Sequence, residues 1–309
     1  MAIDPGLQKA IELSKMMEPW KFTEDMVVAL RKNLDESYRE PYTERINSVS
    51  DLKIRYSDIT LDARLYEPDT PGDGIIIFFH GGGFVFDSID SHDNVCRIIA
   101  NSSSFRVLSV GYRLAPENRF PSAVEDAFNS FLWVYERSEE MGIDRNKIAI
   151  MGDSSGGNLC GAASLMLRDR GKPMPKIQVM VYPFVGVDQS SFSMREYTKG
   201  YRLDREMLLW IASMYLRTPE DMVSPYFSLF AADDFRGIEE TIIVTGEYDP
   251  LRDMGESLAD RMIKEGVSVT SFRCLGMVHG FVNFTGISPS ARNFLEMISY
   301  ITGRRLSGK

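Results

Sequence analysis

Ser154 lies in a stretch whose residue types and spacing suit nucleophilic chemistry. The run Gly152-Asp153-Ser154-Ser155-Gly156 matches the pattern Gly-x-Ser-x-Gly. The apolar residues 148–151 precede it, and a segment rich in small and apolar residues, 159–167, follows it. This pattern predicts a buried strand, a tight turn and a helix, with the serine at the apex of the turn in a strained conformation that exposes its hydroxyl. We therefore predict that Ser154 is a nucleophile.

A serine hydroxyl is a weak nucleophile at neutral pH and needs a neighbouring base. The chain has three histidines, His80, His92 and His279. His80 begins a glycine loop and is expected to hold that loop by hydrogen bonding. His92, between polar neighbours, is expected to be a solvated helix start. His279 lies on a loop bracketed by glycines after the last predicted strand, so it is the predicted base.

The base in turn needs an acid that orients it, and this acid is expected at the end of the preceding strand. Asp249 occupies that place, and the chain order Ser154, Asp249, His279 is the order found in α/β-hydrolases. Glu247 and Asp253 are weaker candidates. Glu247 still belongs to the turn, and Asp253 is expected to cap the following helix.

A glycine run supplies a candidate site for a developing oxyanion. The apolar residues 75–79 lead directly into His80 and three consecutive glycines. Ordering three glycines costs much backbone entropy, which is justified where N–H groups must approach a ligand closely. Lipases and esterases use such a loop as an oxyanion hole. We predict the N–H groups of Gly82, Gly83 and Ser155 as donors; a plain turn is the alternative.

The elements that would position these residues alternate in type along the chain. Strands are predicted at 75–79, 106–110, 148–151, 177–182, 241–245 and 267–274. Helical patterns separate most of them, which predicts an α/β fold with a mainly parallel sheet and right-handed connections. Residues 49–66 alternate apolar and polar side chains and fit two antiparallel edge strands.

Two further segments interrupt this alternation. Residues 1–47 are predicted to be helical, with one apolar stripe formed by Phe22, Met26, Leu30 and Leu34 with Val27 beside them. Residues 185–223 form an insertion rich in methionine and aromatic residues. Each segment is either a packing arm or part of a cap over the site. As a cap wall, the methionines would be adaptable without making the pocket deep.

Composition excludes several classes of function. The net charge of −9 and the lack of a basic cluster argue against nucleic acid and against an anionic membrane surface. The apolar runs are too short for a membrane span, and the N-terminus lacks a signal-peptide core. Three scattered cysteines indicate a reducing cytoplasm. Because neither a metal-ligand spacing nor a phosphate-binding loop is found, no cofactor is predicted.

Five motifs in order resemble the hormone-sensitive-lipase-like, or family IV, carboxylesterases of microbes. They are His80-Gly81-Gly82-Gly83-Phe84, the run 112–117, Gly152 to Gly157, Asp249-Pro250-Leu251 and His279-Gly280-Phe281. The resemblance implies an α/β-hydrolase domain, 48–184 and 224–309, under a cap made of 1–47 and 185–223. It also implies hydrolysis of short- to medium-chain acyl esters through an acyl-enzyme. Ser155 departs from the usual alanine of the family but keeps its backbone N–H.

Other functions stay open from the sequence alone. A non-catalytic protein that binds a small ligand, as in plant hormone receptors similar to this family, would share the fold, and His279 argues against it. An amidase or acyltransferase would use the same three residues. The expected partner is a small-molecule ester, and the resemblance suggests a homodimer formed through the last sheet edge.

Overall fold

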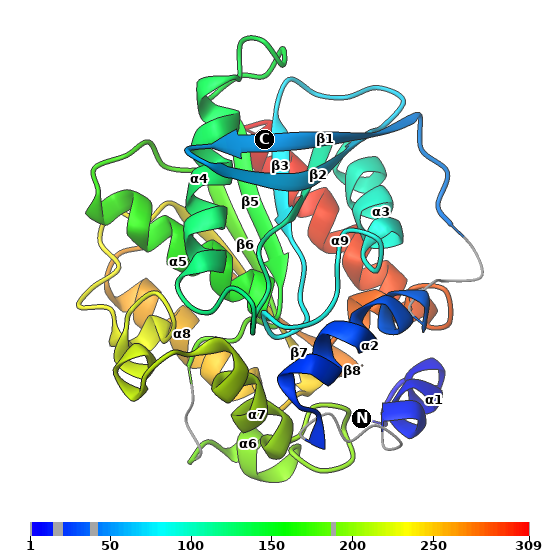
Figure 1. Cartoon of the computed structure of the whole chain (residues 1–309). Coiled ribbons are helices and arrows are strands. Elements are labelled where there is room, and N and C mark those ends of the chain that lie inside the picture. Colours follow the sequence, from blue (N-terminus) through cyan, green and yellow to red (C-terminus); the bar gives the residue numbers. More distant parts are fainter. Residues whose placement is uncertain (1, 15–20, 38–42, 187–189, 309) are drawn as a thin grey trace.

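A single mostly parallel sheet forms the centre of the protein (Figure 1). The computed structural model describes residues 2–14, 21–37, 43–186 and 190–308. Within them, the sheet order is β1-β2-β4-β3-β5-β6-β7-β8. The strands are β1 (Ser48–Tyr56), β2 (Ile59–Glu67), β3 (Ile75–Phe79), β4 (Arg106–Gly111), β5 (Ile148–Asp153), β6 (Ile177–Val181), β7 (Glu240–Tyr248) and β8 (Val269–Val278). Only the β1–β2 and β2–β4 pairs are antiparallel, so the predicted α/β fold is confirmed.

Helices cover both faces of the sheet, which explains the unbroken apolar character of its central strands. The helices are α1 (Pro5–Ser14), α2 (Glu24–Ser37), α3 (Asp93–Ser103), α4 (Ser122–Glu136), α5 (Ser155–Asp169), α6 (Phe192–Glu196), α7 (Arg205–Tyr215), α8 (Arg252–Lys264) and α9 (Pro289–Leu306). Along β3, Ile75, Ile77 and Phe79 belong to the core cluster that also holds residues of α4, α5 and α8, whereas Ile76 and Phe78 belong to the cluster that holds residues of α3 and α9. This alternation follows from the two-residue period of a strand.

One strand boundary differs from the prediction. β8 continues to Val278 instead of ending at Cys274, because a register shift in β7 between Gly246 and Tyr248 lets the two strands pair again beyond the irregularity.

The connection between β6 and β7 spans 182–239, and holds α6, α7 and the 3₁₀ turns Pro219–Val223 and Leu229–Ala231. The predicted insertion 185–223 lies within this connection.

The N-terminal helix α2 lies against the loop that follows β3. Arg31 Nε donates to the carbonyl of Val85 over 2.7 Å, and its Nη1 lies 2.6 Å from Glu117 Oε1. Val27 is fully buried, whereas Met26 is 46% exposed. Within the predicted stripe, α2 therefore turns Val27 toward the core and leaves Met26 partly exposed.

The insertion contacts the N-terminal segment through a hydrogen bond. In α7, Trp210 Nε1 donates to the carbonyl of Phe22 over 3.2 Å. Of the methionines predicted to line a cap, Met207 faces the site described below and Met194 is buried in the core. Met16 and Met17, and the side chain of Leu34, lie outside the described residues.

We predict that Gly156→Ala destabilises the fold by about 3 kcal/mol or more, since overpacking of a core costs this much where neighbours cannot move. A Cβ at Gly156 would lie 1.9 Å from the backbone carbonyl oxygen of Phe79. Urea unfolding provides the measurement. Gly142→Ala is the control, because Gly142 has a φ of +63° but nothing within 4 Å of an added Cβ. It should lose only about 1 kcal/mol through backbone strain. Equal losses in both variants would contradict the prediction.

Candidate active site

Ser154 occupies the sharp turn between β5 and α5. Its φ of 54° and ψ of −116° lie in a region that non-glycine residues rarely adopt. The Ser154 N–H donates to the carbonyl of Val181 over 2.9 Å, which ties the turn to the next strand. Both flanking glycines are required, because a Cβ at Gly152 would lie 2.4 Å from the backbone of Gly156. The turn has the predicted form, with the serine hydroxyl held at its apex.

Three side chains from different elements meet at this turn. Ser154 Oγ lies 2.9 Å from His279 Nε2, and His279 Nδ1 lies 2.8 Å from Asp249 Oδ2. Asp249 follows β7 and is fully buried, and His279 follows β8 and is 8% exposed. The other oxygen of Asp249 accepts the Leu251 N–H over 2.8 Å. The structure therefore brings together the serine, histidine and aspartate that the sequence predicts, over up to 125 residues of chain.

The two weaker candidate acids serve other contacts. Asp253 Oδ2 accepts the N–H of Ser193 over 2.7 Å and so connects α8 to α6. The prediction that Asp253 caps α8 is wrong. The helix begins at Arg252, so Asp253 already belongs to its first turn. Glu247 accepts the Gly276 N–H over 2.7 Å, inside the β7–β8 pair, and lies in β7 rather than in a turn.

The glycine loop after β3 presents N–H groups beside Ser154. Gly82 and Gly83 have φ values of +95° and +64°, which favour glycine. The Gly82 carbonyl accepts the N–H groups of Val85 and Phe86, which turns the loop back on itself. In the described part of the chain, no hydrogen bond is found from the N–H groups of Gly82, Gly83 or Ser155. Three donors are thus available near the serine.

His80 holds the start of this loop. Its Nδ1 lies 2.9 Å from the carbonyl oxygen of Gly81, and its ring stacks on Tyr112 at 4.4 Å. The Tyr112 hydroxyl donates to the carbonyls of His80 and Gly81 over 2.9 and 3.1 Å. Burial, and then the nearby His92, lowers the pKa of His80 to about 3, so this ring is neutral at physiological pH.

The prediction that His92 is solvated is wrong, because the structure buries its side chain fully beside Asp153. Its polar neighbours in the sequence pointed to solvent, whereas α3 packs its first turn beneath the sheet. His92 Nε2 lies 3.2 Å from Asp153 Oδ1, an electrostatic contact without hydrogen-bond geometry. Burial alone would lower the pKa of His92, but the Asp153 carboxylate outweighs burial and raises it. The same pairing, against burial, lowers the pKa of Asp153.

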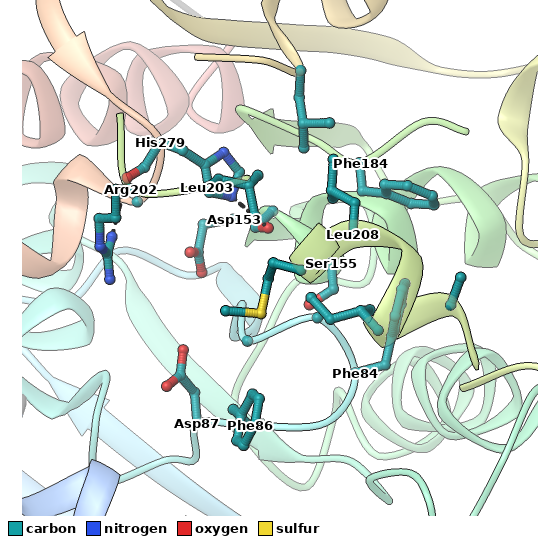
Figure 2. Close-up of a pocket in the computed structure, with 18 of the residues that line it drawn as sticks. Phe84, Phe86, Asp87, Asp153, Ser155, Phe184, Arg202, Leu203, Leu208 and His279 are labelled. Atoms are coloured by element: carbon teal, nitrogen blue, oxygen red, sulfur yellow. Dashed lines mark hydrogen bonds between the residues drawn. The ribbon is translucent and has the colours of Figure 1, made fainter. Parts of the chain in front are cut away.

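A cavity of about 170 Å³ opens at Ser154, and we call it the Ser154 pocket. One part of its wall is apolar and consists of Phe84, Phe184, Leu208, Ile211 and Phe227. Another part carries the polar side chains Asp87, Arg202, Asp204 and Asn283. Arg202 Nη1 donates to the His279 carbonyl over 3.0 Å. Figure 2 shows His279 and Arg202 at one side and Phe184, Leu208 and Phe84 at the other.

The sequence analysis did not single out these polar pocket residues. Arg202 and Asp204 lie in the insertion, where no motif marks them, and Asp87 follows the glycine loop as one acidic residue among several. Tyr182 was also missed; its hydroxyl donates to Asp153 over 3.2 Å, and its ring lies 5.0 Å from that of His279. Its place directly after a buried strand was the available signal.

The described residues contain neither a metal-binding cluster nor a membrane-spanning helix. No group of three or more His, Cys, Asp or Glu side chains in these ranges is placed to hold a metal ion. None of the helices described there has the length and apolar character needed to cross a bilayer.

Comparison with known proteins places these features in a wider group. A family model described as the α/β-hydrolase fold matches residues 76–283. The chain is 39% identical to an arylesterase of Saccharolobus solfataricus, over 96% of this chain and 97% of the relative. It is 33% identical to the carboxylic ester hydrolase LipN of Mycobacterium tuberculosis, over 96% and 82%. The solved esterase of Pyrobaculum calidifontis matches with a TM-score of 0.88 and 37% identity, over 100% and 99%.

The raised pKa of His92 predicts a pH-dependent contribution to stability. A protonated His92 stabilises the fold fully below its unfolded pKa of about 6.5, and this contribution is lost as pH rises through the higher folded value. His92→Gln should therefore cost about 3–5 kcal/mol at pH 6, the usual cost of breaking a buried ion pair. The difference from wild type should shrink by pH 9.

Urea unfolding at pH 6, 7.5 and 9 measures this difference. His80→Gln is the matched control, because burial holds the pKa of His80 at about 3. The ring is neutral in the folded protein, so below the unfolded pKa of about 6.5 protonation of His80 favours the unfolded chain. The loss of stability for His80→Gln should therefore be slightly smaller at pH 6 than at pH 9, opposite in direction to the change for His92→Gln. A loss for His92→Gln that does not change with pH would show that His92 is not charged in the folded protein.

Proposed function

Because the chain belongs to the α/β-hydrolase family, and within it to the hormone-sensitive-lipase-like carboxylic ester hydrolases, we propose that it cleaves esters at Ser154. In this proposal His279 is the general base and Asp249 orients it. The observation that carries it is the continuous contact from Asp249 Oδ2 to His279 Nδ1, 2.8 Å, and from His279 Nε2 to Ser154 Oγ, 2.9 Å. The comparisons do not support the alternatives, a non-catalytic binding protein or an amidase or acyltransferase.

The acylation step follows from this geometry. Neutral His279 donates its Nδ1–H to Asp249, so Nε2 is free to take the proton of Ser154 as Oγ attacks the ester carbonyl carbon. The carbonyl π electrons move to the oxygen of the tetrahedral intermediate. When this intermediate collapses, the bond to the alcohol oxygen breaks, and His279 gives its proton to that oxygen. The alcohol leaves, and the acyl group stays on Ser154.

The negative oxygen of the intermediate needs hydrogen-bond donors that are already in place. We assign this role to the N–H groups of Gly82, Gly83 and Ser155, and Ser155 also begins α5, where the helix dipole favours negative charge. His80 and Gly81 support the loop that holds the first two. In deacylation, water gives a proton to His279 as it attacks the acyl carbon. When the second tetrahedral intermediate collapses, the bond to Ser154 Oγ breaks, His279 returns the proton to Oγ, and the acid leaves.

Finer features of the function rest on the family and on the pocket. The aromatic wall of Phe84, Phe184 and Phe227, whose rings meet edge to face and tilted, suits a short to medium acyl chain, since each methylene contributes about 0.8 kcal/mol only while it is buried. We assign residues 1–47 and 185–223 to a cap over the domain 48–184 and 224–309. The contacts of Arg31 and Trp210 support this assignment.

Location and assembly belong to the same proposal. Three buried cysteines without a disulfide suit a reducing cytoplasm. A homodimer could form through β8, the last strand in the sheet order, whose outer edge has no partner among the described strands.

Ser154→Ala should remove nearly all ester hydrolysis, a loss on the order of 10⁵-fold or more in kcat, because no other group would form the acyl-enzyme. Hydrolysis of p-nitrophenyl esters from C2 to C12 measures it, and the wild-type profile should peak between about C4 and C8. Circular dichroism checks the fold. Retention of more than a few per cent of wild-type kcat in a folded variant would show that the nucleophile is another residue.

Asp249→Asn should lower kcat by about 10⁴-fold, since an amide favours the wrong tautomer of the base. Asp253→Asn is the matched control, four residues away and without contact to His279, and should lower kcat only a few-fold through the α6–α8 contact. Steady-state kinetics with a butyrate ester compares the two. If Asp253→Asn were the more damaging change, the orienting acid would be wrongly assigned.

A further inference from the structure

We propose that the polar end of the Ser154 pocket binds the alcohol part of the ester and selects a neutral alcohol that carries free hydroxyl groups, as in monoesters of glycerol. By the polar end we mean the polar side chains Asp87, Arg202, Asp204 and Asn283, all of which line the pocket. The inference rests on the proposed function, because it takes the direction of the ester from the role of His279. It names a substrate class that the sequence and the relatives leave open.

The direction of the substrate follows from proton transfer. His279 gives its proton to the leaving oxygen, so the alcohol must lie on the His279 side of Ser154. Figure 2 places Arg202 and Leu203 on this side, and the Arg202 guanidinium donates to the His279 carbonyl. The acyl chain is then left with the opposite wall, where Phe84 and Phe184 meet edge to face at 6.4 Å.

Asp87 carries the first acceptor of the polar end. It is 9% exposed, and in Figure 2 its carboxyl group points into the pocket. Its φ of 65° lies in the left-handed region. Such a conformation costs a side chain about 1–3 kcal/mol and tends to be kept at functional sites. Glycine would fit here without strain, so the carboxyl group is the reason we infer for a side chain at this position.

Asp204 carries the second acceptor. It precedes α7 at the position where an aspartate usually caps a helix, yet its side chain makes no capping hydrogen bond. It lines the Ser154 pocket instead and is partly buried. Burial, and then Glu206, raises the pKa of Asp204, which is the mark of a carboxyl group withdrawn from water.

Asn283 adds an unsatisfied group to the same end. It is 9% exposed, it lines the pocket four residues after His279, and its Oδ1 has no hydrogen-bond partner among the described residues. A buried amide oxygen without a partner is costly, so a rotation of the Asn283 amide that brings one of its polar atoms beside a hydroxyl of the ligand would be favoured.

These groups together favour a hydroxyl over the other alcohol chemistries. Asp87 and Asp204 accept hydrogen bonds, Arg202 donates them, and a hydroxyl group can do both. An apolar alcohol would displace water from these groups without replacing the hydrogen bonds that the water made. A cationic alcohol would meet the fixed charge of Arg202. Hydrogen bonds to charged groups contribute about 1.5–3 kcal/mol each, so even one net bond gives about tenfold or more in kcat/KM.

The test compares alcohols of one shape on one acyl group. Wild-type enzyme is given propyl butyrate, glycerol 1-monobutyrate, which adds two hydroxyl groups to the same three carbons, and butyrylcholine. We expect kcat/KM for the glycerol ester to exceed that for the propyl ester by about tenfold or more. A propyl ester hydrolysed as well as the glycerol ester would overturn the inference. A preference for butyrylcholine would also overturn it, in favour of a cation site.

Two variants locate the effect. Asp87→Gly removes the carboxyl group and relieves the backbone strain, so it should fold, and Asp204→Asn keeps the shape of the side chain. Each should lower the glycerol-to-propyl ratio of kcat/KM by about fivefold to tenfold, corresponding to about 1 kcal/mol. Asp260→Asn, an exposed change on α8, should leave the ratio unchanged. A wild-type ratio that persists in both pocket variants would place the hydroxyl recognition elsewhere and overturn the assignment.

Failure of this inference differs from failure of the proposed function. If Ser154→Ala abolishes hydrolysis of all three esters but wild type prefers the propyl ester, only the alcohol selection is wrong. If Ser154→Ala hydrolyses them as well as wild type, the nucleophile is wrong and the direction of the substrate falls with it.

Discussion

The close approach of the β5–α5 turn to the end of β3 is the constraint on which the site depends. Gly156 packs directly on the carbonyl of Phe79, and no side chain fits between them. This contact holds Ser154 at the apex of its turn. It also places the N-terminus of α5 beside the glycine loop that continues from Phe79. The proposed nucleophile and the proposed oxyanion donors are therefore positioned by one backbone contact between neighbouring parallel strands.

Buried polar and ionisable side chains pack against the same turn. Asp153, next to the serine, faces His92 on one side and the Tyr182 hydroxyl on another. A carboxylate in this position would be costly alone, and its pairing with His92 offsets the loss of water and raises the pKa of His92. Burial and the nearby His92, at 5.6 Å between ring centroids, lower the pKa of His80. The surroundings therefore shift the pKa values of these two neighbouring histidines in opposite directions.

The proposed cap segments contact the loops around the pocket through backbone carbonyl groups. Arg31 from α2 binds the carbonyl of Val85 in the loop after the glycines, and Arg202 from the insertion binds the carbonyl of His279. Each arginine therefore links a proposed cap segment to a loop that carries a proposed functional group. A movement of either segment would change the position of that loop.

The sequence by itself determined the chemistry and the order of the elements. Gly-x-Ser-x-Gly between an apolar run and a helix, Asp249 after one strand and His279 after the next indicated the three residues, because local patterns encode strand ends and tight turns. Which polar residues are buried, and which face the pocket, depends instead on how distant elements pack together. His92 has polar neighbours yet is buried, and Asp204 has the position of a helix cap yet lines the pocket. Burial depends on what packs from distant parts of the chain, and no local pattern records it.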